Sequence, residues 1–297
     1  MTPVRQYLAE EIAIDHADGL ITRREAVRQL LLLGLSASST TALLAACARE
    51  PVRTPPVTST PSPTRTGEAS PPAAGPITFP GPEGRTLQGA WATTGRPRGA
   101  VLVIHENRGL TAHIRSLPGR LAASGYAALA VDLLSEEGGT ASFSDPAEAT
   151  AALGRVRPER FVADMKAGLT ELQRRVEGAK LATVGFCFGG GMVWRLLASG
   201  EPRLAAAVPF YGPLPDPADF SGSRAAVLAI YAELDSRVNA SRDVAGEALE
   251  RAGIPHELVT FPKADHAFFN DTGPRYSAEA AAAAYQRVLD WFERYLA

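Results

Sequence analysis

Residues Lys180 to Gly191, Lys-Leu-Ala-Thr-Val-Gly-Phe-Cys-Phe-Gly-Gly-Gly, decide the fold class of this sequence. Their apolar run predicts a buried strand that passes through Gly185-Phe-Cys-Phe-Gly189 into a helix, which is the form of a nucleophile elbow with cysteine in place of serine. Such a turn brings the strand and helix backbones so close that there is no room for a Cβ at the flanking glycines. Cys187 would lie at a helix N-terminus, where free N–H groups and the helix dipole favour a thiolate. The alternative is a buried, inert cysteine beside a glycine-rich turn.

Apolar runs and amphipathic stretches alternate on both sides of this turn. Continuous apolar runs, typical of strands covered on both faces, occupy 100–105, 126–131, 181–186, 205–211, 226–231 and 257–261. Helical patterns occupy 115–124, 158–176, 189–199, 240–252 and 278–295. The stretches 77–80 and 87–91 fit an antiparallel lead-in hairpin. Strand alternating with helix predicts an α/β fold, with a mostly parallel central sheet and helices on both faces.

A cysteine nucleophile needs a base, and the base needs an acid to orient it. Asp235 follows the apolar run 226–231 and His266 follows the run 257–261, so both lie just beyond the carboxyl ends of predicted strands. Active sites of open α/β sheets gather at that edge, and the order nucleophile, acid, histidine is that of the α/β-hydrolases. Glu233 is the alternative acid, and a solvated loop carboxylate is the structural alternative for either residue.

These motifs resemble those of the dienelactone hydrolase family of α/β-hydrolases, and the resemblance covers residues 77–297. It rests on Gly-Phe-Cys-Phe-Gly-Gly at 185–190, on the Asp235 loop, on the His266-Ala-Phe turn and on Val-Ile-His-Glu-Asn-Arg-Gly at 103–109. The resemblance implies hydrolysis of a lactone or ester through an acyl-enzyme at Cys187, with His266 as general base and Asp235 orienting it.

The resemblance also implies roles for the 103–109 turn. The backbone N–H groups of Phe188 and Asn107 would hold the oxyanion, and Glu106 would lie near the thiol and take part in its activation. The alternative for Glu106 is a loop-positioning salt bridge with Arg108 or another arginine. No metal or other cofactor is expected, because no metal-ligand spacing is present in the sequence.

Four residues are candidates for the wall of a substrate pocket. His105 ends the 100–105 run and is either a substrate contact or a hydrogen-bonded structural histidine. Arg108 follows in the same turn. Tyr211 and Phe268 suggest an apolar pocket wall or core packing. Relatives that act on dienelactone use arginines near the catalytic histidine, whereas here Ala-Phe-Phe-Asn follows His266 and Arg275 comes only later. The pattern therefore does not single out dienelactone as the substrate.

The first quarter of the chain has the marks of an export signal. Paired Arg23 and Arg24 precede a mildly apolar stretch, as in twin-arginine signals, and Leu44-Ala-Ala-Cys47 resembles the lipobox of bacterial lipoproteins. The prediction is a signal over 1–47 with lipid on the sulfur of Cys47. The alternative is an amphipathic helix over 4–46 that packs on the domain or stays in the membrane, with Cys47 as an ordinary thiol. An export signal gives no reason for the acidic, helix-compatible pattern of residues 1–21.

Residues 48–76 read as a tether between this signal and a catalytic domain at 77–297. They hold eight Pro and eight Ser/Thr with almost no large apolar side chain, so they cannot bury enough surface to offset their ordering entropy. The mature protein is predicted to be a monomeric hydrolase that acts on a small ester or lactone. Lipid would hold it to the outer face of the bacterial cytoplasmic membrane. The second candidate function is a solute-binding lipoprotein without catalysis.

Composition excludes other classes of protein. The 297 residues carry 30 Lys+Arg against 32 Asp+Glu, a formal net charge of −2, with no clustered basic field of the kind that nucleic-acid binders carry. Only two cysteines occur, Cys47 and Cys187, and each has a separate context, so a disulfide framework is not expected.

Overall fold

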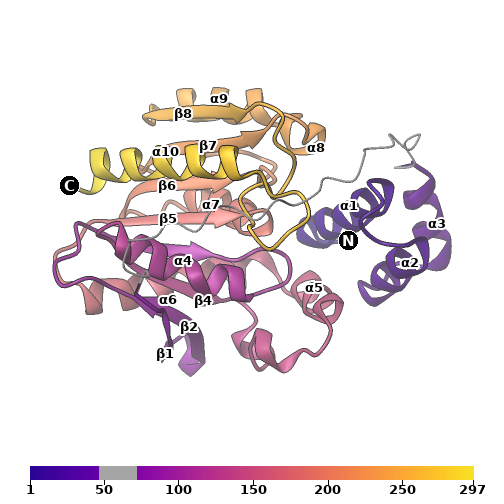
Figure 1. Cartoon of the computed structure of the whole chain (residues 1–297), viewed down its shortest axis with the longest axis horizontal. Helices are drawn as coiled ribbons and strands as arrows, with labels where there is room; N and C mark the ends of the chain where they lie inside the picture. The colour runs from indigo at the N-terminus through magenta and orange to yellow at the C-terminus, as the bar shows by residue number, and fades with distance from the viewer. Residues whose placement is uncertain (47–71) are drawn as a thin grey trace.

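An eight-stranded sheet runs through the computed structural model, which describes residues 1–46 and 72–297 (Figure 1). The strand order is β1-β2-β4-β3-β5-β6-β7-β8; β2 runs antiparallel to β1 and β4, and all other neighbours are parallel. The predicted mostly parallel sheet and its lead-in hairpin are confirmed. The strands are β1 (Gly75–Pro80), β2 (Thr86–Ala92), β3 (Ala100–Ile104), β4 (Ala127–Asp132), β5 (Leu181–Phe186), β6 (Leu204–Phe210), β7 (Ala226–Ala232) and β8 (His256–Phe261).

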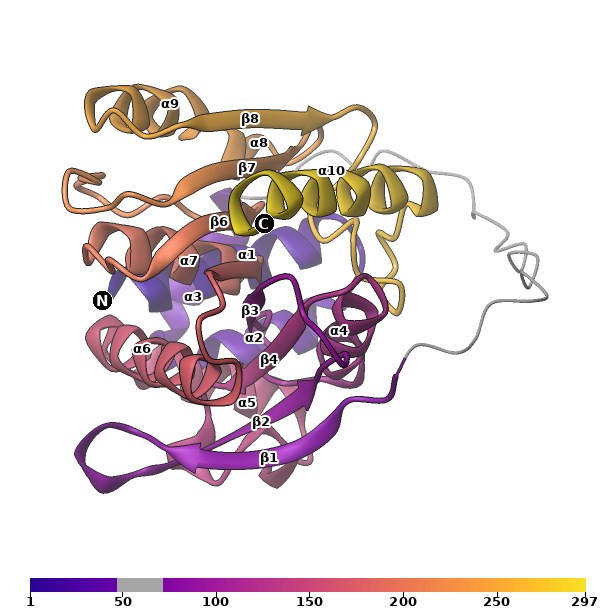
Figure 2. The same ribbon diagram turned by 90° about the vertical axis from the view of Figure 1, so that its left-hand side faces the viewer.

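Helices cover both faces of this sheet, which is why the central strands are apolar along their whole length. Every residue of β3, β4, β5 and β7 is buried. Helices α4 and α10 lie on one face, and α6 and α7 lie on the other (Figure 2). The helices of this part of the chain are α4 (Ala112–Ala123), α5 (Pro146–Arg155), α6 (Pro158–Arg175), α7 (Phe188–Ala198), α8 (Ser236–Asn239), α9 (Arg242–Arg251) and α10 (Ala278–Leu296).

Two elements differ from the sequence-based expectation. Helix α5 was not predicted, because its buried side chains are mostly alanine and give a weak apolar pattern. Asp145 caps it by accepting a hydrogen bond from the Ala147 N–H at 2.9 Å. Strand β1 begins at Gly75, two residues inside the predicted tether. Cys47 and residues 48–71 of the tether lie outside the described residues.

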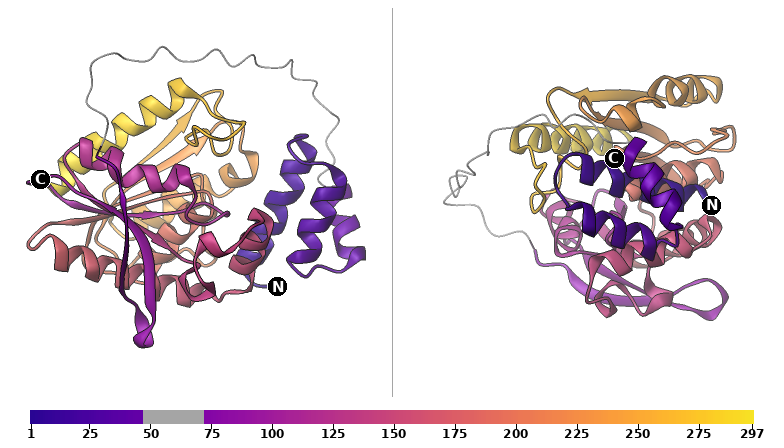
Figure 3. Two further views of the ribbon diagram at one scale, coloured as in Figure 1. Left: turned by 60° about the horizontal axis from the view of Figure 1, so that its bottom comes forward. Right: turned by 90° about the vertical axis from the view of Figure 1, so that its right-hand side faces the viewer.

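The N-terminal residues form three helices that pack together and against α5. These are α1 (Pro3–Ala17), α2 (Arg23–Leu32) and α3 (Ala37–Ala46), so the chain turns twice where the alternative above expected one helix over 4–46. Gly19 and Gly34, with φ of 76° and 79°, allow the two turns. The three helices lie together in front of the domain (Figure 3, right), at the side where the parallel strands end (Figure 1). Within the described ranges, no helix is both long and apolar enough to cross a membrane.

Candidate active site

Cys187 stands at a strained turn between β5 and α7. Its φ of 57° and ψ of −118° lie outside the regions that residues with a Cβ ordinarily adopt, and such strain persists only where the surrounding structure imposes it. Glycines make the turn possible: a Cβ on Gly185 would lie 2.3 Å from the Gly189 carbonyl oxygen, and a Cβ on Gly189 would lie 2.5 Å from the carbonyl oxygens of His105 and Ile104. The strand, turn and helix predicted from the glycine pattern are therefore present.

The structure brings Asp235 and His266 together beside this turn. Asp235 caps the N-terminus of α8, where its Oδ1 accepts a hydrogen bond from the Val238 N–H. Its Oδ2 lies 2.5 Å from Nδ1 of His266, in the loop after β8. The alternative acid, Glu233, points elsewhere and accepts a hydrogen bond from the Lys263 N–H at 2.7 Å. A ring nitrogen of His266 and Sγ of Cys187 lie within 4.8 Å of each other. A carboxylate on one ring nitrogen leaves the other free to exchange a proton with the thiol.

Glu106 faces the same space from the loop after β3. It is 8% exposed, and its Oε2 accepts a hydrogen bond from Nδ2 of Asn270 at 2.7 Å. Among the ion pairs of the described residues none joins Glu106 to Arg108 or another arginine, so the salt-bridge alternative is not what the structure has. Burial, opposed by the Asn270 hydrogen bond, raises the pKa of Glu106 to about 7.

The candidate oxyanion donors lie on either side of Cys187. Phe188 is the first residue of α7, so its N–H has no partner within the helix. Asn107 lines the cavity that reaches Cys187, and its carbonyl accepts a hydrogen bond from Oγ1 of Thr150 at 2.8 Å. Phe188 and Asn107 thus both lie near the thiol, and their role as oxyanion donors stays a prediction.

Of the four pocket candidates, Arg108 lines the cavity that reaches Cys187. His105 is fully buried: its Nε2 accepts from the Leu133 N–H at 3.1 Å and its Nδ1 lies 2.7 Å from the Glu106 carbonyl oxygen. It is therefore the hydrogen-bonded structural histidine rather than a substrate contact. Tyr211 and Phe268 are also buried and pack in the aromatic cluster behind His266, with 5.0 Å between the ring centres of Tyr211 and His266. These two aromatic residues therefore pack in the core, as the alternative to a pocket wall predicted.

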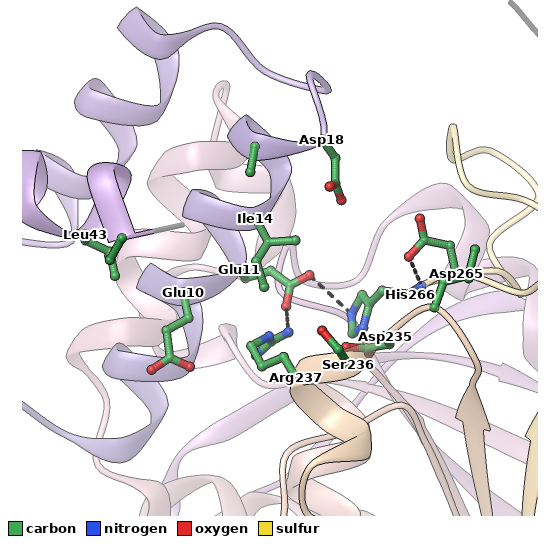
Figure 4. Close-up of a pocket in the computed structure, with 13 residues that line it drawn as sticks. Glu10, Glu11, Ile14, Asp18, Leu43, Asp235, Ser236, Arg237, Asp265 and His266 are labelled. Carbon is green, nitrogen blue, oxygen red and sulfur yellow. Dashed lines mark hydrogen bonds and ion pairs between the residues drawn. The ribbon is translucent and has the colours of Figure 1, made fainter. Parts of the chain in front are cut away.

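Sequence reasoning missed the residues that α1 brings to the site. The Tyr7 hydroxyl lies 3.3 Å from Sγ of Cys187, and Oε1 of Glu11 lies 3.3 Å from Nε2 of His266. The other carboxylate oxygen of Glu11 pairs with Arg237 (Figure 4). The guanidinium of Arg237 lies over the Tyr7 ring. A signal for this was present, because residues 7, 11 and 15 are spaced by four and so share one face of a helix.

Two cavities open between α1 and the domain. One of about 430 Å³ is lined by Glu11, Asp235, Arg237 and His266 among others, and one of about 300 Å³ reaches Cys187, Glu106 and Asn107. Glu11 and His266 line both cavities, so α1 divides a single crevice at the carboxyl edge of the sheet.

The charges around Cys187 differ from the expectation of a favoured thiolate. Burial, together with the negative charge of Glu11, raises the pKa of the Cys187 thiol although His266 acts to lower it. Burial alone would lower the pKa of His266, but Glu11, Cys187 and Asp235 together raise it well above its usual value. With α1 in place, burial and the Glu11 carboxylate therefore act against the thiolate that a helix N-terminus favours.

Among the described residues, Glu11, Cys187 and His266 also form a group of three side chains that are close enough together to bind one metal ion. One ligand atom from each lies within 4.8 Å of the other two, and these are ligand types that zinc accepts. Their positions in the sequence have no ligand spacing, so only the fold brings them together. In the structure Glu11 is engaged by Arg237, and His266 by Asp235.

The buried Glu106 carboxyl predicts a component of stability that depends on pH. Its pKa is about 7 in the folded chain against 4.5 unfolded, so the folded protein binds this proton more tightly and the free energy of unfolding falls as pH rises from about 4.5 to 7. We expect Glu106→Gln, which cannot titrate, to lack this fall, a difference of about 3 kcal/mol in order of magnitude. Urea denaturation of both proteins at pH 5 and pH 8 measures it, and parallel pH profiles would contradict the assignment.

The strand order, the strained turn at Cys187 and the Asp235–His266 pair define an enzyme of the α/β-hydrolase fold. Comparison with known proteins also identifies the family. Residues 87–296 match the Dienelactone hydrolase family. The chain is 34% identical over 212 residues to a protein of Escherichia coli O157:H7 and 34% identical over 218 residues to one of Yersinia pestis, each described as "Putative carboxymethylenebutenolidase". Each match covers 67% of this chain, and 78% and 79% of the relatives.

Solved structures lead to the same family. A crystal structure described as "Putative Dienelactone Hydrolase" from Klebsiella pneumoniae superposes with a TM-score of 0.66 at 30% identity, covering 75% of this chain and 98% of that one. The chain belongs to the dienelactone hydrolase family, and it is a hydrolase.

Proposed function

We propose that the protein hydrolyses a carboxylic ester or lactone through a thioester on Cys187, with His266 as the general base and Asp235 orienting the imidazole. The observation that carries this proposal is the position of the thiol at the strained turn, within reach of a histidine whose far nitrogen is held by a carboxylate. The names of the relatives, carboxymethylenebutenolidase and dienelactone hydrolase, support the substrate class.

The proposed reaction has two stages. His266 takes the proton from Sγ as sulfur bonds to the carbonyl carbon, and the carbonyl π electrons move onto oxygen. When that π bond re-forms, the bond to the leaving oxygen breaks and His266 returns its proton to it, leaving an acyl thioester. Water, deprotonated by the same histidine, then attacks the thioester carbon. The carbon–sulfur bond breaks, and the proton on His266 passes to sulfur, which releases a carboxylic acid and restores the thiol. The N–H groups of Phe188 and Asn107 are the proposed donors to the oxyanion in both stages.

A panel of lactones, aryl esters and short acyl thioesters tests the substrate class. It is assayed on the full chain and on the mature chain that the processing proposed below would produce. Turnover of aryl esters or lactones supports the proposal. Tight binding of such compounds without turnover would favour the second candidate, a solute-binding lipoprotein.

We also propose that the chain is exported and held to the outer face of the bacterial cytoplasmic membrane by lipid on Cys47. The sequence supports this through Arg23 and Arg24, through Leu-Ala-Ala-Cys at 44–47, and through the Pro- and Thr-rich stretch 48–76, which would separate a monomeric domain from the membrane.

Labelling with palmitate tests the anchor. We expect a lipid-labelled protein in the membrane fraction of a host that processes lipoproteins, because the cysteine sulfur is the atom that takes the lipid. A Cys47→Ala variant should lose the label and remain larger by the unremoved signal. Absence of label in the unaltered chain, with identical fractionation of the variant, would contradict the proposal.

A further inference from the structure

The first three helices form a unit that is fitted to the active site. We define the N-terminal unit as residues 3–46, which comprise α1, α2 and α3. Tyr7, Glu11 and Asp15 share the face of α1 that lies over the crevice, and Figure 4 shows Glu11 between Arg237 and His266. The side chains of this unit nearest to the reacting atoms, Tyr7 and Glu11, are polar, and an export signal has no need of them.

We propose that the N-terminal unit is an internal inhibitor, in which Tyr7 and Glu11 occupy the place of the substrate, so that catalysis requires α1 to leave the crevice. The inference rests on the proposed reaction at Cys187.

The two reacting atoms are covered by the unit. An acyl carbon has to approach Sγ to about 3–3.5 Å before it reacts, but the Tyr7 hydroxyl already lies 3.3 Å from Sγ. The nitrogen that must take the thiol proton, Nε2 of His266, has Oε1 of Glu11 at 3.3 Å. Cys187 is 3% exposed and His266 is 4% exposed. A substrate cannot meet both atoms while α1 stays in this position.

The charge of Glu11 also opposes the chemistry. A carboxylate beside the thiol disfavours formation of the thiolate, and the same carboxylate competes for the imidazolium that should stabilise it. Glu11 is itself kept ionised, since the charges of His266 and Arg237 lower its pKa in spite of burial. Departure of α1 would remove this charge and hydrate the thiol, and both changes act to lower the pKa of Cys187.

Ion pairs hold the unit on the domain at three separate points. Glu11 pairs with Arg237, and Asp15 and Asp18 pair with Arg275 at 2.9 and 2.7 Å. At the far end of the unit, Arg28 lies 2.6 Å from Asp145 at the start of α5. Two of the anchoring domain residues, Arg237 and Arg275, lie in the crevice, so the acidic face of α1 matches the charge of the site that it covers.

An apolar contact lies between these ion pairs. Leu8 of α1 and Leu33 are buried against α5 at Gly154, and a Cβ on Gly154 would lie 2.6 Å from a methyl carbon of Leu33 and 3.6 Å from one of Leu8. Glycine thus permits the close approach of the unit to the domain. Because burial of apolar side chains is the main stabilising contribution in such contacts, this is the place to disrupt the docking.

The unit ends where the proposed processing begins. Helix α3 ends at Ala46, and the next residue is the proposed lipidated cysteine, Cys47. Cleavage between these two residues would remove all three helices and merge the two cavities that α1 now separates. The precursor would stay closed until it is exported, and the same cut would expose both the lipid site and the catalytic thiol.

The test uses the 297-residue chain with Cys47→Ser, which blocks the proposed processing and leaves Cys187 as its single thiol. Leu8→Asp places a carboxylate in the buried contact from the side of the unit, and Gly154→Leu adds a bulky side chain from the side of the domain. We expect each to raise the rate of Cys187 alkylation by iodoacetamide at least about tenfold and to raise kcat/KM for p-nitrophenyl acetate in parallel. Leu31→Asp, at a position 47% exposed on α2, is the matched control and should change neither.

The outcomes separate this inference from the proposed hydrolysis. Unchanged alkylation in both variants, or lower ester turnover with a retained near-UV circular dichroism spectrum, would overturn the inhibitor and make α1 part of the working site. Faster alkylation without ester turnover would uphold the inhibitor and refute the hydrolysis. Asp15→Asn with Asp18→Asn, a conservative pair that removes the partners of Arg275, should raise alkylation by a smaller factor even if the larger substitutions fail to fold. No rise in this pair, with both larger variants unfolded, would count against the inference.

Discussion

Replacement of Cys187 by alanine is expected to lower kcat for a p-nitrophenyl ester by at least about 10³-fold. The methyl side chain cannot attack the carbonyl carbon, and His266 alone can only activate water, so the acyl-enzyme route is closed. The substitution removes one buried sulfur and also relieves strain at φ 57° only slightly, because alanine still carries a Cβ. The loss should therefore come from chemistry and not from unfolding.

The measurement compares kcat in the unaltered chain and in the Gly154→Leu background, each with and without Cys187→Ala. Cys187→Ser keeps a nucleophile of lower acidity and should retain a fraction of the activity lost in the alanine variant. Thermal unfolding of all variants shows whether the fold is kept. Activity of Cys187→Ala within a few fold of its parent would show that another group carries the reaction.

The second large effect is expected at Gly189. A Cβ there would lie 2.5 Å from two carbonyl oxygens at the end of β3, and these are backbone atoms that cannot rotate away. Gly189→Ala must push α7 from the sheet or distort the loop that carries Glu106 and Asn107. We expect a loss of about 3 kcal/mol or more in the free energy of unfolding, at the upper end of overpacking effects.

Gly246 in α9 provides the matched control for this substitution. A Cβ at Gly246 would meet only a methyl carbon of Leu258, at an ordinary contact distance of 3.5 Å. Gly246→Ala should raise stability by about 0.5–1 kcal/mol, because alanine loses less backbone entropy in a helix. Urea denaturation of the two variants gives both values, and equal effects would contradict the steric role of Gly189.

The catalytic domain could be predicted from sequence because its signals are local. Glycine spacing around Cys187 and apolar runs ending at Asp235 and His266 each depend on neighbours a few residues away, and parallel strands bring their carboxyl ends to one edge. The roles of His105 and Tyr211 were harder to predict. A side chain at the end of a strand can point into the crevice or into the core behind it. For His105 the hydrogen bonds to the backbone of Glu106 and Leu133 show that it points into the core.

The N-terminal unit could not be placed from sequence for a different reason. Its arginine pair, and the Leu-Ala-Ala-Cys sequence at 44–47 where it ends, favour an export signal. The spacing of Tyr7, Glu11 and Asp15 shows only that they share a helix face. Nothing local says which surface that face meets. The partners, Arg237 and Arg275, lie more than two hundred residues further along the chain, so their contacts exist only once the domain has folded. The position of α1 also explains why a thiol at a helix N-terminus has a raised pKa here, because the thiol is buried and Glu11 places a negative charge beside it.

The central claim, that the reaction passes through a thioester on Cys187, is tested most directly by trapping that intermediate. The chain with Gly154→Leu is mixed with an aryl acetate, quenched in acid within milliseconds to seconds, digested and examined by mass spectrometry. The account predicts a transient acetyl adduct on the peptide that contains Cys187, absent from Cys187→Ala, with a burst of phenol that matches its amount. Steady turnover with no adduct on Cys187 at any quench time, or an adduct on another residue, would contradict it.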